Sequence, residues 1–233
     1  MRLSAVTLGS VVLGSAFALA ACTPTGLQVD PPSGSIAAAD PSGPLAPRDE
    51  CSPVSGLGEL QTALRQAVTA RDADALRALV DPYVQLDFGG GSGWPELRRR
   101  LIAADYRLWD EIERAVALGC GVSRSADGGS YASWPWYFSK DVIPLDPYEA
   151  MIVTGSDVAL RDGPSADSPQ IGSVSWDYVR LKEYSDAAFV PVVTRDGRAG
   201  YVDAGKLRSL VDYRVVADKT DSGWKIMAII AGD

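Results

Sequence analysis

The sequence predicts an α+β fold in which a helical N-terminal unit is followed by a small β-barrel and a C-terminal β-hairpin. Apolar residues recur at helical spacing through much of residues 57–118. Across residues 151–210 the pattern changes to short strand-like runs that are separated by glycine-containing turns. Two further strand-like runs flank a turn at residues 221–223. Helices and strands therefore occupy separate stretches of the chain, which is typical of α+β proteins.

Residues 1–21 predict a secretory signal peptide. Met1-Arg2 provides a positive start, an uncharged apolar run follows, and Leu19-Ala20-Ala21-Cys22 closes the segment. This ending resembles a bacterial lipobox, which implies cleavage before Cys22 and attachment of acyl chains such as palmitate to that cysteine. An uncleaved transmembrane helix is the alternative, but Gly, Ser and Thr occupy several positions of a span that needs about 20 apolar residues.

The residues after the lipobox predict a flexible linker, residues 22–52, that begins at the lipidated Cys22. This stretch is rich in Pro, Gly, Ser and Ala and contains no aromatic residue, so it buries too little surface to offset its ordering entropy. Thr23 stands where an aspartate commonly retains Gram-negative lipoproteins in the inner membrane. The resemblance therefore implies a lipid-anchored protein of the bacterial cell envelope, in the outer membrane and facing the periplasm.

Charge and composition exclude several classes of function. The net charge is −8 and no basic run is present, which argues against nucleic-acid binding and makes the acyl chains the expected membrane attachment. The chain has no histidine, so catalytic triads and dyads that use histidine, as well as histidine metal sites, are excluded. We expect no cofactor and no metal.

Cys51 and Cys120 are the two cysteines that remain after the lipobox. In an oxidising periplasm an even pair predicts a disulfide. On the chain-entropy view, closing a loop of roughly 70 residues stabilises the fold by about 4 kcal/mol. Two separate buried thiols are the alternative.

Residues 53–148 predict an α+β domain. A helix is expected from Gly58 to Ala70, and Asp72 or Asp74 is expected to cap a second helix that stops at Pro82. The alternating run 83–88 predicts a strand with Val84, Leu86 and Phe88 on one face. A third helix is expected to open at Trp94-Pro95, and a fourth, capped by Asp105, to end at Gly119.

The phrase RDADALRALVDPYVQLDF, residues 71–88, resembles the nuclear transport factor 2-like, SnoaL-like family. The resemblance implies a cone-shaped α+β fold whose pocket serves catalysis, binding or assembly in different members. An Asp-His pair of the kind that some members use is impossible here, because the chain has no histidine.

Residues 149–211 resemble the bacterial SH3-like domain. The resemblance rests on four groups of residues in order, which are Val158-Ala159-Leu160-Arg161-Asp162-Gly163-Pro164-Ser165, Ile171-Gly172, Asp196-Gly197 and Gly200-Tyr201-Val202. It implies a small β-barrel that binds cell-wall peptide, peptidoglycan or a periplasmic protein. Phe189 stands where a tryptophan often precedes the hairpin, which puts any ligand contact of that indole in doubt.

Aromatic residues are the candidate ligand contacts. Trp176, Tyr178, Tyr184 and Tyr201 line a shallow groove in one interpretation and fill the small barrel in the other, which we favour. A second aromatic run, YASWPWYFS, contains Trp134 and Trp136 as candidates for stacking on sugar rings. We favour its interpretation as a seam between the two domains, because an exposed run this apolar promotes aggregation.

Residues 212–233 predict a terminal hairpin with its turn at Asp221-Ser222-Gly223. Its closing strand resembles those of nuclear transport factor 2-like sheets. The hairpin is therefore expected either to pack on the barrel or to complete the sheet of the α+β domain.

No acid pair stands out as a glycosidase site. Asp110, Glu111 and Glu113 fall on a predicted helix where charged residues normally face solvent. We therefore predict a non-enzymatic lipoprotein with no catalytic residues, in which the barrel is a binding or docking module. The rival prediction is a pocket-bearing enzyme or small-molecule carrier of the nuclear transport factor 2-like type.

Overall fold

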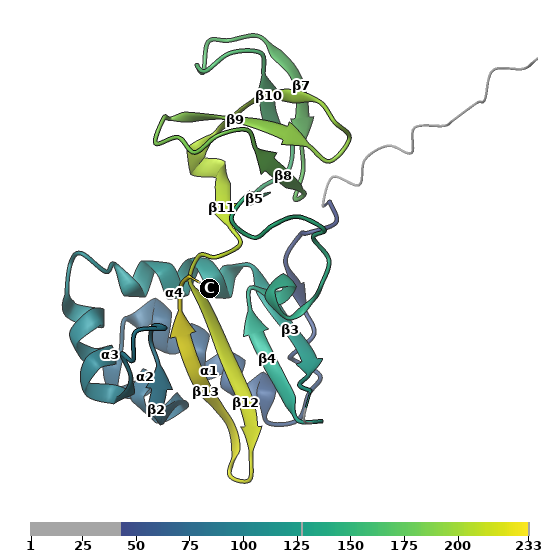
Figure 1. Cartoon of the computed structure of the whole chain (residues 1–233). Coiled ribbons are helices and arrows are strands. Elements are labelled where there is room, and N and C mark those ends of the chain that lie inside the picture. The colour runs from purple at the N-terminus through teal and green to yellow at the C-terminus, as the bar shows by residue number, and fades with distance from the viewer. Residues whose placement is uncertain (1–42, 127, 233) are drawn as a thin grey trace, which may run out of the picture. The chain divides into compact units, whose positions relative to one another are not determined.

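The computed structural model describes residues 43–126 and 128–232, which form four α-helices and two β-sheets (Figure 1). The predicted lipobox and Cys22 lie outside the described residues. The helices are α1 (Leu57–Ala70), α2 (Ala73–Leu79), α3 (Gly93–Ile102) and α4 (Leu108–Ala117). In order across the first sheet, the strands are β1 (Arg48–Asp49), β3 (Gly119–Arg124), β4 (Ser130–Trp134), β12 (Arg214–Thr220), β13 (Gly223–Ile230) and β2 (Val80–Gln85).

Helices α1 and α2 form for the local reasons that the sequence indicates. The apolar residues of α1 recur at helical spacing and are buried, and Arg71 ends the helix in the left-handed conformation with φ 51°. Asp72 caps α2 by accepting hydrogen bonds from the backbone N–H groups of Asp74 and Ala75, both at 3.0 Å. The helix gives way to β2 before Pro82, which lies within the strand.

Two local predictions in this part of the chain are wrong. Phe88 does not share the buried face of Val84 and Leu86, because β2 ends at Gln85 and the Phe88 side chain is 55% exposed. The N-cap of α4 is Arg107, at φ 46°, and not Asp105. A turn at residues 103–107 thus separates α3 from α4, so the chain enters α4 two residues later than the capping preference suggests.

The C-terminal hairpin completes the first sheet. β12 pairs with β4, with Val215 opposite Trp134, and β13 pairs in parallel with β2, so the hairpin lies in the middle of the sheet. Of the two placements that the sequence allows, the structure has the one within the α+β sheet. Helices α1 and α4 contribute to the same apolar core as these strands, and Figure 1 shows them on one face of the sheet.

The second sheet is inserted between β4 and β12. In sheet order its strands are β11 (Leu207–Ser209), β5 (Ala150–Val153), β8 (Tyr178–Leu181), β9 (Phe189–Thr194), β10 (Ala199–Asp203), β6 (Val158–Arg161) and β7 (Gln170–Val174). Its own core is built largely from valines, and the Asp196-Gly197 turn joins β9 to β10 with Gly197 at φ 87°.

The second sheet is open, whereas the sequence predicts a small SH3-like β-barrel. Within residues 43–126 and 128–232, β7 pairs only with β6 and β11 pairs only with β5, so the sheet has two edges. Turn glycines indicate where strands end, but pairing depends on register and on the residues that each strand buries. The glycine pattern therefore predicts the short strands of this region better than the closure of the sheet.

The last residues of the predicted linker belong to the fold. β1 pairs in parallel with β3. Leu45 is only 3% exposed, and its N–H donates to the carbonyl oxygen of Trp176 at 2.7 Å. The assignment of residues 43–52 to a flexible linker is therefore wrong, because these residues gain both main-chain pairing and apolar burial that their composition does not indicate.

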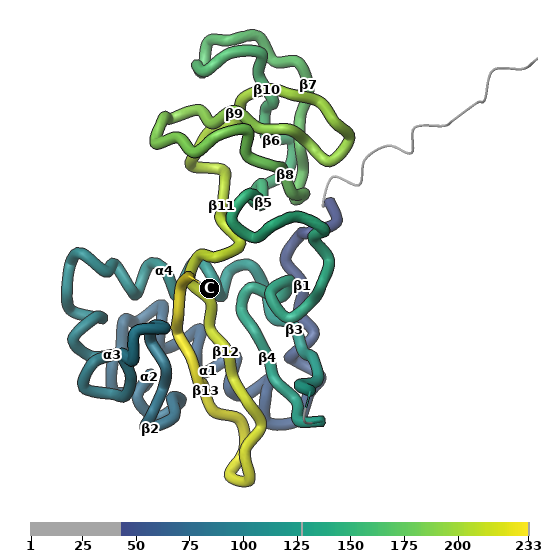
Figure 2. The backbone as a smooth tube through the Cα atoms, viewed as in Figure 1, coloured from purple at the N-terminus to yellow at the C-terminus, as the bar shows by residue number. Residues whose placement is uncertain are grey.

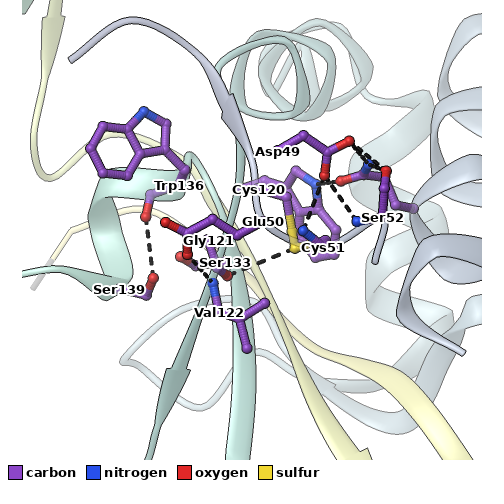
Figure 3. The surroundings of a disulfide bond; sticks show 12 residues. Asp49, Glu50, Cys51, Ser52, Cys120, Gly121, Val122, Ser133, Trp136 and Ser139 are labelled. Carbon is purple, nitrogen blue, oxygen red and sulfur yellow. Dashed lines mark hydrogen bonds between the residues drawn. A yellow bond between two sulfur atoms is a disulfide. The ribbon is translucent and has the colours of Figure 1, made fainter. Parts of the chain in front are cut away.

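A disulfide joins Cys51 to Cys120, as the sequence predicts (Figure 3). Both cysteines are fully buried in the core of the α+β part, and the bridge ties the segment after β1 to β3. Next to it, Glu50 accepts a hydrogen bond from the N–H of Val122 at 3.1 Å and pairs with Lys140 at 2.8 Å.

A third apolar cluster joins the two sheets. It consists of buried Leu45, Leu118, Trp136, Tyr137 and Ile152, and half-buried side chains such as Trp176 and Tyr178 pack against it. The tube in Figure 2 shows the chain passing from β4 into the second sheet and returning to β12. Both sheets belong to one compact unit of the chain. None of the helices in the described part is both long and apolar enough to cross a membrane.

Candidate binding surfaces

Two of the predicted aromatic ligand contacts are buried. Trp134 is 0% exposed, and its Nε1 donates to Oε1 of Gln61 at 3.3 Å. Trp136 is 2% exposed and lies in the cluster between the sheets, with the guanidinium of Arg48 4.1 Å from its ring centre. Neither indole has a free face for a sugar ring. The structure instead places Trp136, together with Tyr137, in the seam that the sequence analysis favours for the aromatic run.

The four aromatic candidates of the second sheet do not converge on one groove. Trp176 and Tyr178 are half-buried against the cluster between the sheets, and Tyr201 is half-buried on β10. Tyr184 is 76% exposed, and its hydroxyl donates to the carbonyl oxygen of Tyr148 at 2.9 Å. Only Tyr184 among them presents most of its side chain to solvent.

A hollow of about 460 Å³, here called the Arg195 hollow, lies on the second sheet. Three segments line it, which are residues 43–44, residues 173–177 and the β9–β10 turn at residues 194–198. Gly43 approaches so closely that a Cβ there would meet the carbonyl oxygen of Ser175 at 1.8 Å. Residues 43–44 therefore form one wall of the hollow. The sequence gives no sign of this hollow, because the segments that line it are far apart in the sequence.

The charged groups of the Arg195 hollow are not equivalent. Nε of Arg198 donates to Oδ2 of Asp196 at 2.8 Å, and the hydroxyl of Thr194 also donates to Asp196. The Thr194 hydrogen bond lowers the pKa of Asp196, although partial desolvation opposes it. Asp177 differs, because burial raises the pKa of its carboxyl group.

Two smaller hollows lie near the connections between the sheets. One of about 380 Å³ is lined by side chains that include Phe138, Ile143, Leu145 and Arg214, whose guanidinium lies 4.4 Å from the Phe138 ring centre. The other, about 420 Å³, is bordered by residues of α4, η2 (Ala204–Lys206) and β11. The charged residue Arg208 lines the second hollow and pairs with Asp212 at 3.2 Å.

The interior of the α+β part is filled by side chains. Leu64 from α1, Ile112 from α4 and Ile226 from β13 are all fully buried in one cluster. The buried Arg100 is satisfied internally, since it pairs with Asp87 and Glu96 and donates to the carbonyl oxygen of Leu86 at 2.8 Å. These contacts give Arg100 a structural role.

Two of the three carboxylates of α4, Asp110 and Glu111, form ion pairs with arginines. Asp110 pairs with Arg71 at 2.6 Å and with Arg107 at 3.2 Å, and Glu111 pairs with Arg114. No two of them face each other across a cleft as the acid and base of a glycosidase do. Among the residues that the structure describes, no three Asp, Glu or Cys side chains gather as metal ligands.

Comparisons with known proteins assign no family to this chain. No family model matches the chain, and no curated protein matches it. Among solved structures, a protein named Rd1NTF2_05 with five substitutions aligns with 75% of this chain and 95% of its own, at 14% identity and a TM-score of 0.28.

Proposed function

We propose that this protein is a bacterial envelope lipoprotein whose second sheet is an SH3-like docking module for peptidoglycan or a periplasmic protein. Cys22 carries the lipid anchor, and the protein faces the periplasm from the outer membrane. The protein is not an enzyme. The observation that carries the proposal is the 76% exposed ring of Tyr184 on a second sheet that also bears the Arg195 hollow, beside an α+β part whose interior is filled by apolar side chains.

The filled interior weakens the rival proposal of a pocket-bearing enzyme or carrier. Such a protein needs a concave site with a few convergent polar groups. The interior of the α+β part holds apolar side chains, and two of its buried polar residues, Arg100 and Gln61, bond to neighbouring protein groups. The α+β part therefore fits the role of a scaffold for the inserted sheet.

The second sheet supplies surface that is suited to docking. The segments 146–149 and 181–184 lie side by side, since Leu181 N–H donates to the carbonyl oxygen of Glu149 at 2.8 Å. The exposed ring of Tyr184 lies on this surface, and large exposed aromatic groups are common anchors of protein interfaces. The turn pattern that resembles bacterial SH3-like domains supports the same assignment.

Co-sedimentation with purified peptidoglycan sacculi tests the proposal. The chain without residues 1–22 is expected to sediment with sacculi or, if its partner is a protein, to crosslink to that protein in intact cells. Replacing Tyr184 by Ala should weaken the association about tenfold, a typical loss for an aromatic anchor. Tyr83→Ala is the matched control, because Tyr83 is 84% exposed on the first sheet.

Three results would count against the docking proposal. In one, the protein neither sediments with sacculi nor forms a crosslink in cells. In the second, Tyr83→Ala weakens association as much as Tyr184→Ala, which would move the docking surface to the α+β part. In the third, Tyr184→Ala leaves the association unchanged, which would remove this face of the second sheet from the interface.

A further inference from the structure

The Arg195 hollow is lined both by a cation whose side chain makes no hydrogen bond within the described residues and by a half-buried carboxylate. Arg195 is exposed in the β9–β10 turn, and its guanidinium lies 6.0 Å from the ring centre of Tyr178. Within the described part of the chain it makes no hydrogen bond and no ion pair. Its neighbour Arg198 is instead held by Asp196 and by the carbonyl oxygen of Ser173, at 2.8 and 3.4 Å.

Asp177 lines the same hollow. One of its carboxyl oxygens accepts the N–H of Tyr178 at 2.8 Å, and the residue is half-buried. Arg195 attracts Asp177 electrostatically, but the two do not come within the 4.0 Å of an ion pair anywhere in the described residues. A cation and an anion thus line one hollow without neutralising each other through contact.

We propose that the Arg195 hollow binds a small zwitterion of the amino-acid or short-peptide class, with its carboxylate on Arg195 and its amine on Asp177. A guanidinium is suited to a carboxylate because it offers two parallel N–H donors. The volume of about 460 Å³ lies within the range of about 300–1,000 Å³ that is usual for small-ligand pockets. The inference rests on the proposed docking function, since it names the chemistry that the second sheet recognises.

The charges around the hollow disfavour ligands of a single sign. A simple anion that reaches Arg195 also meets the carboxylates of Asp177 and Asp196, and a simple cation that reaches Asp177 meets Arg195 and Arg198. A molecule with both charges avoids both repulsions. A peptide with a free amine and a free carboxylate has this pattern.

Ligand-observed NMR with three related probes tests the site on the full chain in mild detergent. The probes are alanyl-alanine, N-acetyl-alanyl-alanine, which lacks the charged amine, and alanyl-alaninamide, which lacks the carboxylate. We expect alanyl-alanine to bind and each modified probe to bind about tenfold more weakly, since hydrogen bonds between charged groups are among the strongest in proteins.

Variants assign each charge to its residue. The Arg195→Gln variant should bind alanyl-alanine and alanyl-alaninamide with equal affinity, because the partner of the probe's carboxylate is gone. The Asp177→Asn variant should bind alanyl-alanine and N-acetyl-alanyl-alanine with equal affinity, because the partner of the probe's amine is gone. Arg180→Gln is the matched control, because Arg180 is exposed on β8 of the same sheet and does not line the hollow. Circular dichroism checks that Asp177→Asn still folds, and the exposed Arg195 provides a test that does not depend on that variant.

Equal binding of the three probes, or an equal loss in Arg180→Gln and Arg195→Gln, would overturn the inference. Failure of alanyl-alanine to bind, while sacculi or a protein partner still bind, would also overturn the site and leave the docking function standing. Binding of alanyl-alanine without any association with sacculi or a partner would support the site and refute the docking function.

Discussion

Gln61 on α1 connects the segment that precedes the helix, residues 49–52, to the core through a small network of hydrogen bonds. Its Nε2 donates to Oδ2 of Asp49 at 3.0 Å and to the hydroxyl of Ser52 at 3.2 Å, and its Oε1 accepts from Nε1 of Trp134. The residue lies on the buried face of α1 among leucines. A single polar residue on an apolar helical face gives no sign in the sequence of which groups it will bond.

Replacing Gln61 by Ala should lower the free energy of unfolding by about 2–4 kcal/mol. The change removes these hydrogen bonds and leaves the fully buried Trp134 indole N–H without its acceptor. Urea denaturation followed by tryptophan fluorescence measures the loss. The matched control is Gln66→Ala, since Gln66 is exposed on the same helix and should change stability by less than about 0.5 kcal/mol. Equal losses in the two variants would contradict the role of the network.

At the scale of the element, the disulfide between Cys51 and Cys120 holds β1 against β3. β1 has only two residues, so its own pairing with β3 contributes few main-chain hydrogen bonds. The disulfide therefore contributes much of the stabilisation that holds β1 and the residues around it against the sheet.

The double replacement Cys51→Ala with Cys120→Ala should lower the melting temperature by many degrees. The chain-entropy estimate for a sequence separation of 69 residues is about 4 kcal/mol, which is a large part of the stability of a domain. Differential scanning calorimetry measures the shift. A reducing agent should have little further effect on the double variant, and a melting temperature equal to that of the natural protein would contradict the prediction.

Local patterns predict the helices, the short strands of the second sheet and both hairpin turns. The signals for these elements lie within the elements themselves, as with the capping aspartate Asp72 and the positive φ of Gly197 and Gly223. Strands β3 and β4 escape prediction, because their glycine and serine content hides the alternation. The Arg195 hollow escapes too, because only tertiary pairing brings Asp177 next to the β9–β10 turn.

The proposed lipid anchor at Cys22 would hold the whole described body at the membrane. We expect Cys22→Ala to abolish labelling with radioactive palmitate and to release the exported protein from the membrane fraction. Labelling that persists in this variant would contradict the lipobox prediction. The double variant Cys51→Ala with Cys120→Ala provides the control, because it should remain labelled despite its lower stability.

The insertion of the second sheet between β4 and β12 determines the order in which parts of the chain can fold as it emerges from its N-terminus. A chain that emerges from its N-terminus presents α1 to α4 and β1 to β4 long before Arg214 arrives. Until then the core of the first part lacks its two central strands, and Trp134 on β4 lacks its cross-strand partner Val215 on β12. The inserted sheet draws on residues 150–209 alone for its strand pairing, so it can form earlier. The first part of the chain to emerge is thus the last to complete its fold. A chain that stalls before residue 214 leaves the first sheet without its central strands, and its exposed apolar face is then open to proteases and to aggregation.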